Sequence, residues 1–297
     1  MIDELSIIIP ALDEDESLPL LVNEIYENLD KTGINYEILV IDDGSRVSVS
    51  SILQENENLK IFRNKFTKGQ SQALLSGIEN SIYKFVVILD ADGQNPPHEI
   101  INLVNEFNEN EGRYEIIAGY RKNRKDKFFR SLYSKVGNFL IKLILNSKIN
   151  DLGCSLKLFR KDLMEDINYT GDIHRVLLIL FEYRNYKIKQ IPVDHKERIY
   201  GETKYGLGRL IPVIVDTFMI YLTEGFTKTA RYSLGKLGIY FGSLSIVLFI
   251  FSLFQKYIQS IFVHKNPIFL VGMIFLFLSI QLFVTSIITF FTENKNS

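Results

Sequence analysis

The chain has one cysteine and no tryptophan among its 297 residues. A single thiol cannot form an intrachain disulfide, so we expect a reducing compartment and a packing role for Cys154. The sequence also lacks the pattern Gly-x-x-x-x-Gly-Lys-Ser/Thr and the pattern Gly-x-Gly-x-x-Gly. Their absence sets aside P-loop and dinucleotide-binding enzymes.

The net charge is only −1, but acidic and basic residues are concentrated in different parts of the chain. Residues 1–110 carry 7 Lys and Arg against 20 Asp and Glu, residues 111–231 carry 23 against 14, and residues 232–297 carry 4 against 1. An acidic first part suits a cation, and a basic second part suits phosphate or an anionic membrane surface. The acidic start Met1-Ile2-Asp3-Glu4 is unlike a signal peptide, so we expect the N-terminal part to stay in the cytoplasm.

Short apolar, β-branched runs alternate with stretches of helix length. With 46% apolar residues, the chain can bury a sizeable core. This alternation predicts an α/β domain over residues 1–207, with a mostly parallel sheet and helices on both faces. The expected strands are 5–9, 37–41, 59–62, 85–89 and 114–118, and the expected helices are 18–30, 69–81 and 97–110.

Polar loops follow three of the expected strands. They are Pro10-Ala11-Leu12-Asp13-Glu14, Asp42-Asp43-Gly44-Ser45 and Asp90-Ala91-Asp92-Gly93-Gln94. Because ligands of such sheets bind beyond the carboxyl ends of the strands, we expect the loops to converge on one rim. Asp-x-Asp alone is a common polar turn. Two carboxylates and an amide at such a rim, however, are oxygen ligands that suit Mg2+ or Mn2+ and leave coordination positions for substrate phosphates.

Two long runs near the C-terminus contain no charged residue. They cover residues 237–254 and 267–291 and form a predicted membrane anchor over residues 234–297. At about 1.5 Å per residue they span roughly 27 and 37 Å, against a hydrocarbon core of about 30 Å. A buried helical hairpin in a soluble protein is the alternative, but both runs are apolar all round. Residues 208–233 are interrupted by Pro212, Asp216 and Glu224 and predict amphipathic helices at the membrane interface.

The motifs together resemble those of a known family. Ser6-Ile7-Ile8-Ile9-Pro10, the Asp42 and Asp90 loops with Pro96-Pro97, and Asp151-Leu152-Gly153-Cys154-Ser155-Leu156-Lys157 are similar to motifs of inverting glycosyltransferases with the GT-A (Rossmann-like) fold. Within them, the chain resembles the polyprenyl-phosphate group, which includes dolichyl-phosphate mannosyltransferases and bacterial undecaprenyl-phosphate glycosyltransferases. The resemblance covers residues 5–210, and the paired C-terminal spans match the bacterial type.

This resemblance implies roles for residues on the acidic rim. Asp90, Asp92 and Gln94 would surround a Mg2+ or Mn2+ ion that bridges the diphosphate of a nucleotide sugar. The chain departs from the family pattern at Leu12 and Asp13, where an aromatic residue and an asparagine are usual. That departure concerns the contact with the base. The residues implied to bind the nucleotide are Pro10, Asp13, Glu14, Asp43 and Asp90.

A second, basic set is implied to hold the phosphate of the acceptor. Arg130 and Ser134 are four residues apart and would share one face of a helix. The planar guanidinium of arginine matches phosphate oxygens. The implied acceptor-phosphate residues are Arg121, Arg130, Ser134, Arg198 and Lys204. The implied catalytic residues are Asp92, Asp151, Arg121 and Arg198, whereas we expect His174 to be structural.

The resemblance implies an inverting hexosyltransferase. It would move a sugar from a UDP- or GDP-linked donor to undecaprenyl or dolichyl phosphate in the bilayer. The second pKa of a phosphate monoester is about 6, so such an acceptor is largely dianionic at neutral pH and needs no general base. We expect a multi-pass protein of the plasma (inner) membrane with its catalytic domain on the cytoplasmic face, and no nucleic-acid partner. The sequence leaves open whether the protein forms a homo-oligomer.

Three other functions remain open at this point. A transferase that acts on a lipid hydroxyl, such as that of diacylglycerol, would need a base, for which Asp151 or Asp172 could serve. A processive polysaccharide synthase shares the fold, but its Gln-x-x-Arg-Trp motif requires a tryptophan that this chain lacks. A non-catalytic membrane scaffold would have no use for Asp90, Asp92 and Gln94 together.

Overall fold

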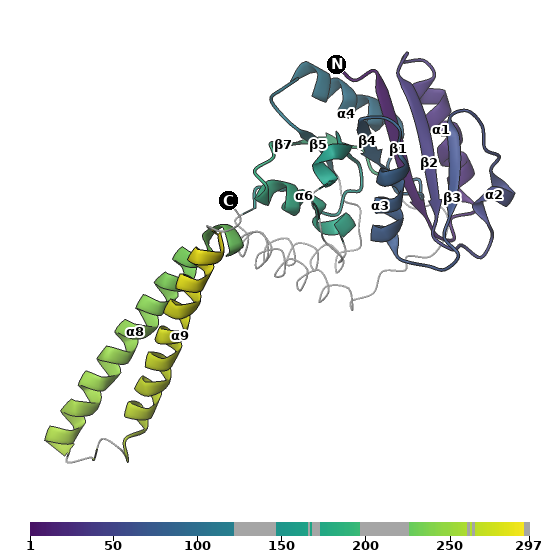
Figure 1. The fold of residues 1–297 in the computed structure, drawn as a ribbon. Helices are drawn as coiled ribbons and strands as arrows, with labels where there is room; N and C mark the ends of the chain where they lie inside the picture. The colour runs from purple at the N-terminus through teal and green to yellow at the C-terminus, as the bar shows by residue number, and fades with distance from the viewer. Residues whose placement is uncertain are drawn as a thin grey trace. The chain divides into compact units, whose positions relative to one another are not determined.

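The computed structural model divides the chain into two compact units, Met1–Ile220 and Tyr221–Ser297 (Figure 1). It describes residues 1–121, 147–165, 167, 173–196, 226–259, 262 and 265–293, and for 226–232, 259 and 289–293 it describes only the helical backbone. The predicted domain boundary at 207/208 lies outside these residues. The division into a catalytic domain, interfacial helices and an anchor therefore stays a prediction.

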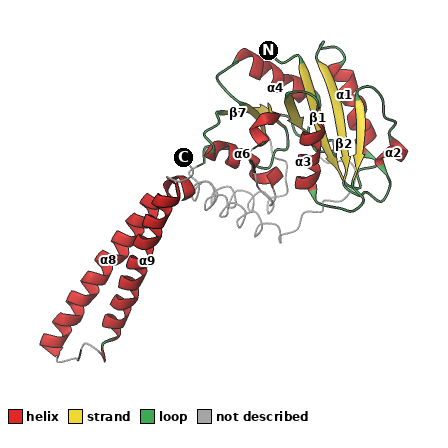
Figure 2. Ribbon diagram, viewed as in Figure 1, coloured by secondary structure: helices red, strands yellow, loops and turns green. Residues whose placement is uncertain are grey.

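The first unit contains a seven-stranded sheet (Figure 2). The strands are β1 Glu4–Ala11, β2 Asn35–Asp42, β3 Leu59–Arg63, β4 Phe85–Ile88, β5 Ile116–Arg121, β6 Lys157–Arg160 and β7 Ile188–Val193. The helices are α1 Ser17–Leu29, α2 Val49–Ile52, α3 Gln70–Asn80, α4 His98–Glu109 and α6 Ile173–Tyr183, with a 3-10 turn, η1, at Lys161–Met164.

The strand order is β3-β2-β1-β4-β6-β5-β7, and only β6 runs against the others. β1 pairs in parallel with β2 and with β4, and β5 pairs in parallel with β7. The carboxyl ends of six strands therefore share one edge with the amino end of β6. That edge is the rim on which the polar loops were expected to converge.

Helices cover both faces of the sheet, so the strands read as continuous apolar runs. On one face, α1 and α4 pack over Leu5, Ile7 and Ile9 of β1. On the other, α3 packs on β1 and β2 and lies beside α6. Phe159 of β6 meets Phe181 of α6 in an edge-to-face contact with ring centroids 5.2 Å apart. Both layers fix the central strands and hence the loops that leave them.

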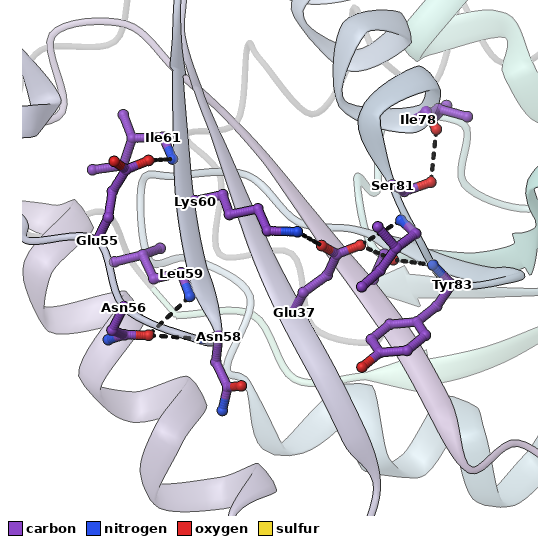
Figure 3. A network of polar contacts seen from close by, with 12 residues as sticks. Glu37, Glu55, Asn56, Asn58, Leu59, Lys60, Ile61, Ile78, Ser81 and Tyr83 are labelled. Atoms are coloured by element: carbon purple, nitrogen blue, oxygen red, sulfur yellow. Dashed lines mark hydrogen bonds and ion pairs between the residues drawn. The ribbon is translucent and has the colours of Figure 1, made fainter.

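The edge of the sheet opposite the rim is held by a buried glutamate, Glu37 of β2 (Figure 3). Its carboxylate accepts hydrogen bonds from Ser6 Oγ at 2.6 Å, Ile82 N at 2.7 Å and Lys60 Nζ at 3.0 Å. Tyr83 N donates to Ser6 Oγ at 3.2 Å. A buried carboxylate is costly unless it is paired, and these partners satisfy Glu37 while joining three strands to the turn before β4.

The second unit is a helical hairpin of α8, Phe226–Gln259, and α9, Pro267–Glu293. Both helices are long and apolar enough to cross a membrane, over Ser233–Ile258 and Pro267–Ile288. The two helices meet through small, polar and aromatic residues: Ser245 Oγ donates to Gly272 O at 2.8 Å, Ser279 Oγ donates to Gly238 O at 2.7 Å, and the rings of Phe241 and Phe275 stack with centroids 5.5 Å apart.

The outward surface of this hairpin is apolar. In the most apolar window of each helix, only 17% and 11% of the residues are buried, and large side chains such as Phe254 and Phe277 are exposed. Small residues inside and apolar residues outside are typical of helices packed within lipid. This distribution argues against the soluble, buried hairpin that was the alternative reading of the sequence.

Candidate active site

The carboxyl edge of the sheet collects the predicted donor-side residues. Pro10 is buried at the end of β1 and is in register with Ile41 of β2. Asp13 and Glu14 follow β1, Asp43 follows β2, and the Asp90 loop follows β4. Because β1 lies between β2 and β4, the three loops are neighbours.

Hydrogen bonds tie the loop after β1 to both of its neighbours. Asp13 N donates to Ser45 Oγ at 3.0 Å, and Asp13 Oδ1 accepts from Arg46 N at 2.8 Å. Asp13 has φ +54°, a region that Asn and Asp tolerate better than most residues, so the substitution of Asp for the family's Asn keeps the backbone geometry. On the other side, Ser17 Oγ donates to Ala91 O at 2.9 Å and to Glu14 Oε2 at 3.1 Å.

Asp43 is buried, and its carboxylate accepts hydrogen bonds from the loop that precedes α3. Its Oδ1 accepts from Asn64 Nδ2 and from Lys68 N, both at 2.9 Å, and its Oδ2 accepts from Gly69 N at 2.7 Å. A carboxylate with three such donors is firmly fixed. The structure therefore gives Asp43 an ordering function at the place where the sequence predicts a nucleotide contact.

The loop after β4 presents oxygen atoms. Asp90, Asp92 and Gln94 are partly exposed, and Gly93 between them has φ +69°. Gln94 N donates to Asp92 Oδ1 at 3.1 Å and closes a tight turn. Gln94 Nε2 donates to Lys196 O at 3.3 Å. The amide oxygen is therefore the atom of this side chain that can contact a bound ligand.

This donor set fits a hard divalent cation. Two carboxylates and one amide oxygen come from five consecutive residues of a loop that is still open to solvent. Mg2+ and Mn2+ prefer oxygen ligands, and with few protein ligands they retain positions for phosphate. The predicted cation residues Asp90, Asp92 and Gln94 are thus brought together in one turn.

A buried cation, Lys157, lies beneath this loop. Lys157 is 1% exposed, and its Nζ donates to the carbonyl oxygens of Cys154 and Ser155. Burial lowers the pKa of Lys157, and the nearby Asp90 opposes that shift. For the Asp90 carboxyl, burial has the opposite effect and raises the pKa. A hydrogen bond from Ser155 and the charges of Lys157 and Arg121 oppose that rise.

Ser155 and Asn95 complete the surroundings of Asp90. Asn95 is 3% exposed, and its Nδ2 donates to Ser155 Oγ at 2.8 Å. Its buried Oδ1 has no hydrogen-bond partner among the residues that the structure describes, which is uncommon in a folded interior. The neighbouring thiol of Cys154 is buried, which raises its pKa and agrees with a packing role.

Arg121 and Asp151 form a bidentate ion pair at the end of β5. Arg121 Nε donates to Asp151 Oδ2 at 2.8 Å and Nη2 donates to Oδ1 at 2.9 Å. The side chains are only 12% and 10% exposed. A Cβ on Gly153 would lie 2.7 Å from Arg121 Nη2, so a side chain there would press on the guanidinium. The bidentate contact fixes the direction of the guanidinium relative to Asp151.

The segment after β7 is pinned next to the Asp90 loop. Lys196 N donates to Gln94 O at 2.8 Å, and Lys196 Nζ contacts Glu24 Oε1 at 3.1 Å. Asp194 N donates to the buried Glu99 Oε1 at 2.7 Å. His98, Glu99 and Asp194 could by spacing hold a metal, but both oxygens of Glu99 already accept hydrogen bonds within the protein.

The structure describes His174, whose two ring nitrogens meet Ser71 Oγ at 2.9 Å and Arg175 Nε at 3.1 Å. These contacts agree with the structural role expected for it. The predicted acceptor and base residues without a described position are Arg130, Ser134, Asp172, Arg198 and Lys204.

The family comparison identifies the class of protein to which the chain belongs. Residues 6–167 match the family described as Glycosyl transferase family 2, which is more than half of the chain. The chain belongs to this family. The predictions of an α/β sheet of this type and of a glycosyltransferase are confirmed.

One relative matches almost the whole chain. It is the dodecaprenyl-phosphate galacturonate synthase of Rhizobium johnstonii, which is 28% identical over 293 residues, 96% of this chain and 86% of the relative. The similarity therefore extends beyond the family domain into the C-terminal helices.

Solved structures share the fold at low identity. The glucosyl-3-phosphoglycerate synthase of Mycobacterium tuberculosis in complex with phosphoglyceric acid has a TM-score of 0.58, is 14% identical, and covers 74% of this chain and 80% of its own. The same enzyme with Mn2+, UDP and glucosyl-3-phosphoglycerate has a TM-score of 0.56 at 12% identity, with coverage of 74% and 80%. Its complex with Mg2+ and UDP has a TM-score of 0.56 at 13% identity, with coverage of 72% and 78%.

Proposed function

We propose that this protein transfers a sugar from a nucleotide diphosphate sugar to a polyprenyl phosphate in a membrane, with inversion at the anomeric carbon. The observation that carries the proposal is the similarity to a dodecaprenyl-phosphate galacturonate synthase over 96% of the chain. The family match alone covers residues 6–167 and says nothing of the acceptor.

The second unit supports a membrane-bound acceptor. Two helices able to cross a bilayer follow the catalytic family domain, and the hairpin exposes apolar side chains to its surroundings. We place the protein in the inner membrane with two spans and the catalytic unit, residues 1–207, on the cytoplasmic face. Lys228, Arg231 and Lys236 precede the charge-free run 237–254, against Lys256 and Lys265 after it, which weakly favours this orientation.

On the donor side, the oxygen-rich turn after β4 would hold Mg2+ or Mn2+ through Asp90, Asp92 and Gln94. When bound there, the ion would neutralise charge on the departing nucleotide diphosphate. Solved structures of this fold contain Mn2+ or Mg2+ with UDP. Pro10, Asp13, Glu14 and Asp43 would line the nucleotide pocket. In this chain Asp43 does so chiefly by ordering the loop 64–69.

On the acceptor side, Arg121 would meet the lipid phosphate together with Arg130, Ser134, Arg198 and Lys204. Asp151 holds the Nε and Nη2 edge of Arg121 and so fixes the direction of its guanidinium. Orienting a preformed cation toward an anion supplies electrostatic stabilisation without reorganisation during the reaction.

The engagement of Asp151 favours a phosphate acceptor over a hydroxyl acceptor. Transfer to a neutral hydroxyl needs a base; of the two candidates, Asp151 has both oxygens bound by Arg121, and Asp172 lies outside the described residues. A phosphate monoester is already anionic and can attack without one. The remaining task is to hold the phosphate oxygen in line with the bond to the leaving nucleotide, which is a matter of proximity and orientation.

A parallel assay of acceptors tests the proposal. Purified full-length protein would receive a panel of labelled UDP- and GDP-sugars with undecaprenyl phosphate in one series and diacylglycerol in the other, and products would be identified by lipid mass. We expect a sugar-linked polyprenyl phosphate from one donor. A product only with diacylglycerol would favour the hydroxyl acceptor and overturn the proposal.

A further inference from the structure

Asp90 receives a hydrogen bond from a helix on the other side of the rim. Gln70 Nε2 donates to Asp90 Oδ1 at 2.9 Å. Gln70 is the first residue of α3, so the contact joins the start of this helix to the loop that follows β4. Neither the acidic set nor the basic set recognised in the sequence includes this glutamine.

The backbone that carries Gln70 is itself fixed by a buried carboxylate. Asp43 accepts from the two N–H groups immediately before Gln70, those of Lys68 at 2.9 Å and Gly69 at 2.7 Å. Gly69 has φ +94°, a conformation that L side chains rarely adopt. The approach of the chain to Gln70 is therefore determined by Asp43 and by the glycine that it holds.

The rest of α3 has little freedom to shift. A Cβ on Gly77 would lie 2.3 Å from Ile8 Cγ2, so the helix lies very close to β1. Next to Gln70, Ser71 Oγ lies 2.9 Å from His174 Nδ1 of α6. A helix anchored at both points fixes the backbone from which the amide of Gln70 reaches Asp90.

An amide suits this position on chemical grounds. It is an uncharged donor, so it orients the carboxylate without cancelling the negative charge that a cation requires. A lysine would compete with the cation, and a glutamate would repel Asp90. Groups that hydrogen-bond a metal-binding carboxylate commonly set its direction and affinity.

We propose that Gln70 is a positioning residue that holds the Asp90 carboxylate for the divalent cation and the nucleotide diphosphate. The inference rests on the proposed function, because it assumes the cation site of Asp90, Asp92 and Gln94. Gln70 touches Asp90 and acts on the ligands through it.

The chain offers a matched control two residues further along the same helix. Gln72 is exposed, so Gln72→Met and Gln72→Glu repeat the chemical changes of Gln70→Met and Gln70→Glu away from Asp90. Full-length proteins in detergent would be titrated with MnCl2 in the presence of UDP or GDP, with free Mn2+ followed by electron paramagnetic resonance. Nucleotide binding in EDTA and the midpoint of thermal unfolding would be measured alongside.

We expect Gln70→Met to weaken Mn2+ binding roughly 10-fold and Gln70→Glu to weaken it further. Both Gln72 variants should match the wild type. Nucleotide binding in EDTA and the unfolding midpoint should be the same in all five proteins. Such a result separates positioning of the carboxylate from a general effect on folding.

Two results would overturn the inference while leaving the proposed function intact. One is Mn2+ affinity in the Gln70 variants equal to that in the Gln72 variants, with tight binding in all. The other is a loss of affinity that appears only together with a lowered unfolding midpoint, which would make Gln70 a structural residue. Absence of Mn2+-dependent nucleotide binding in the wild type would instead contradict the proposed function.

Discussion

At the scale of single residues, the site depends on side chains that hold other side chains. Asp43 fixes a loop, Gln70 contacts Asp90, and Asp151 fixes Arg121. Substitutions of the supporting residues should therefore change binding constants selectively.

Asp151→Ala tests this view of the arginine pair. Without its bidentate partner the guanidinium of Arg121 can turn, and a misplacement of about 1 Å can cost on the order of 10²-fold in rate. We expect a loss of about that size in transfer at low polyprenyl phosphate, with nucleotide affinity close to that of the wild type. Steady-state kinetics with each substrate varied in turn would measure both.

Asp162→Ala is the control for this experiment. Asp162 also binds an arginine with both oxygens, since Arg160 Nε lies 3.0 Å and Nη2 2.6 Å from them, but that pair is exposed. An exposed pair contributes about 0–1 kcal/mol, so this variant should behave as the wild type. Equal kinetics for the two variants would show that Asp151 has no function in the site.

The sequence predicted some of the site and missed the rest for a physical reason. Asp90, Asp92 and Gln94 were recognised because they lie within five consecutive residues that follow an apolar strand. The contacts of Gln70 and Lys157 with Asp90 are tertiary: Lys157 stands within a family-like motif, but nothing near either residue in the sequence links it to Asp90. Lys157 within Leu156-Lys157-Leu158 was the one visible anomaly.

At the scale of elements, the parallel core could be predicted and the distal strands could not. The predicted strands 5–9, 37–41, 59–62 and 85–89 correspond to β1–β4, with ends that differ by one or two residues. The prediction 114–118 is shifted, because β5 continues through Arg121 to pair with Val193. β6 has only four residues, and β7 is an edge strand that includes Pro192, so neither carries a strong apolar pattern.

Close packing of α3 on the sheet gives a prediction for Gly77→Ala. The added Cβ would lie 2.3 Å from Ile8 Cγ2 and 3.3 Å from Ile41 Cγ1, so the helix or the strand must move. Such overpacking commonly costs about 1–3 kcal/mol. Reactivity of the buried thiol of Cys154 during heating would report the midpoint of thermal unfolding.

The comparison for that experiment is Gln72→Ala on the exposed side of the same helix. It should leave the temperature of thiol exposure unchanged, whereas Gly77→Ala should lower it. An unchanged midpoint for Gly77→Ala would mean that α3 adjusts freely. The structural basis for the fixed position of Gln70 would then be wrong.

At the scale of the whole molecule, a glycosyltransferase family domain and an apolar helical hairpin belong to one chain. The acidic first part contains the loop proposed to bind the cation, and the hairpin exposes apolar side chains as lipid-facing helices do. The strongly acidic and the strongly basic segments, residues 1–110 and 111–231, both lie ahead of the two span-length segments, and residues 232–297 carry few charges.

The orientation of the hairpin can be tested with a single engineered thiol. We expect the full chain to resist extraction by alkaline carbonate, because both helices are long enough to span the bilayer. In a Cys154→Ser background, Phe262→Cys lies in the loop between the helices and should react with an impermeant maleimide added outside intact cells. Labelling only after lysis would reverse the proposed orientation, and release by carbonate would contradict spanning.

The most direct test of the central claim is the mass of the lipid formed from a labelled nucleotide sugar and undecaprenyl phosphate by the wild type and by Asp92→Ala. The account predicts a polyprenyl phosphate that carries one sugar in the wild type. It predicts none with Asp92→Ala, although that variant should be membrane-inserted and folded. An equal yield of this lipid from both proteins, or nucleotide release without any sugar-bearing polyprenyl phosphate, would contradict it.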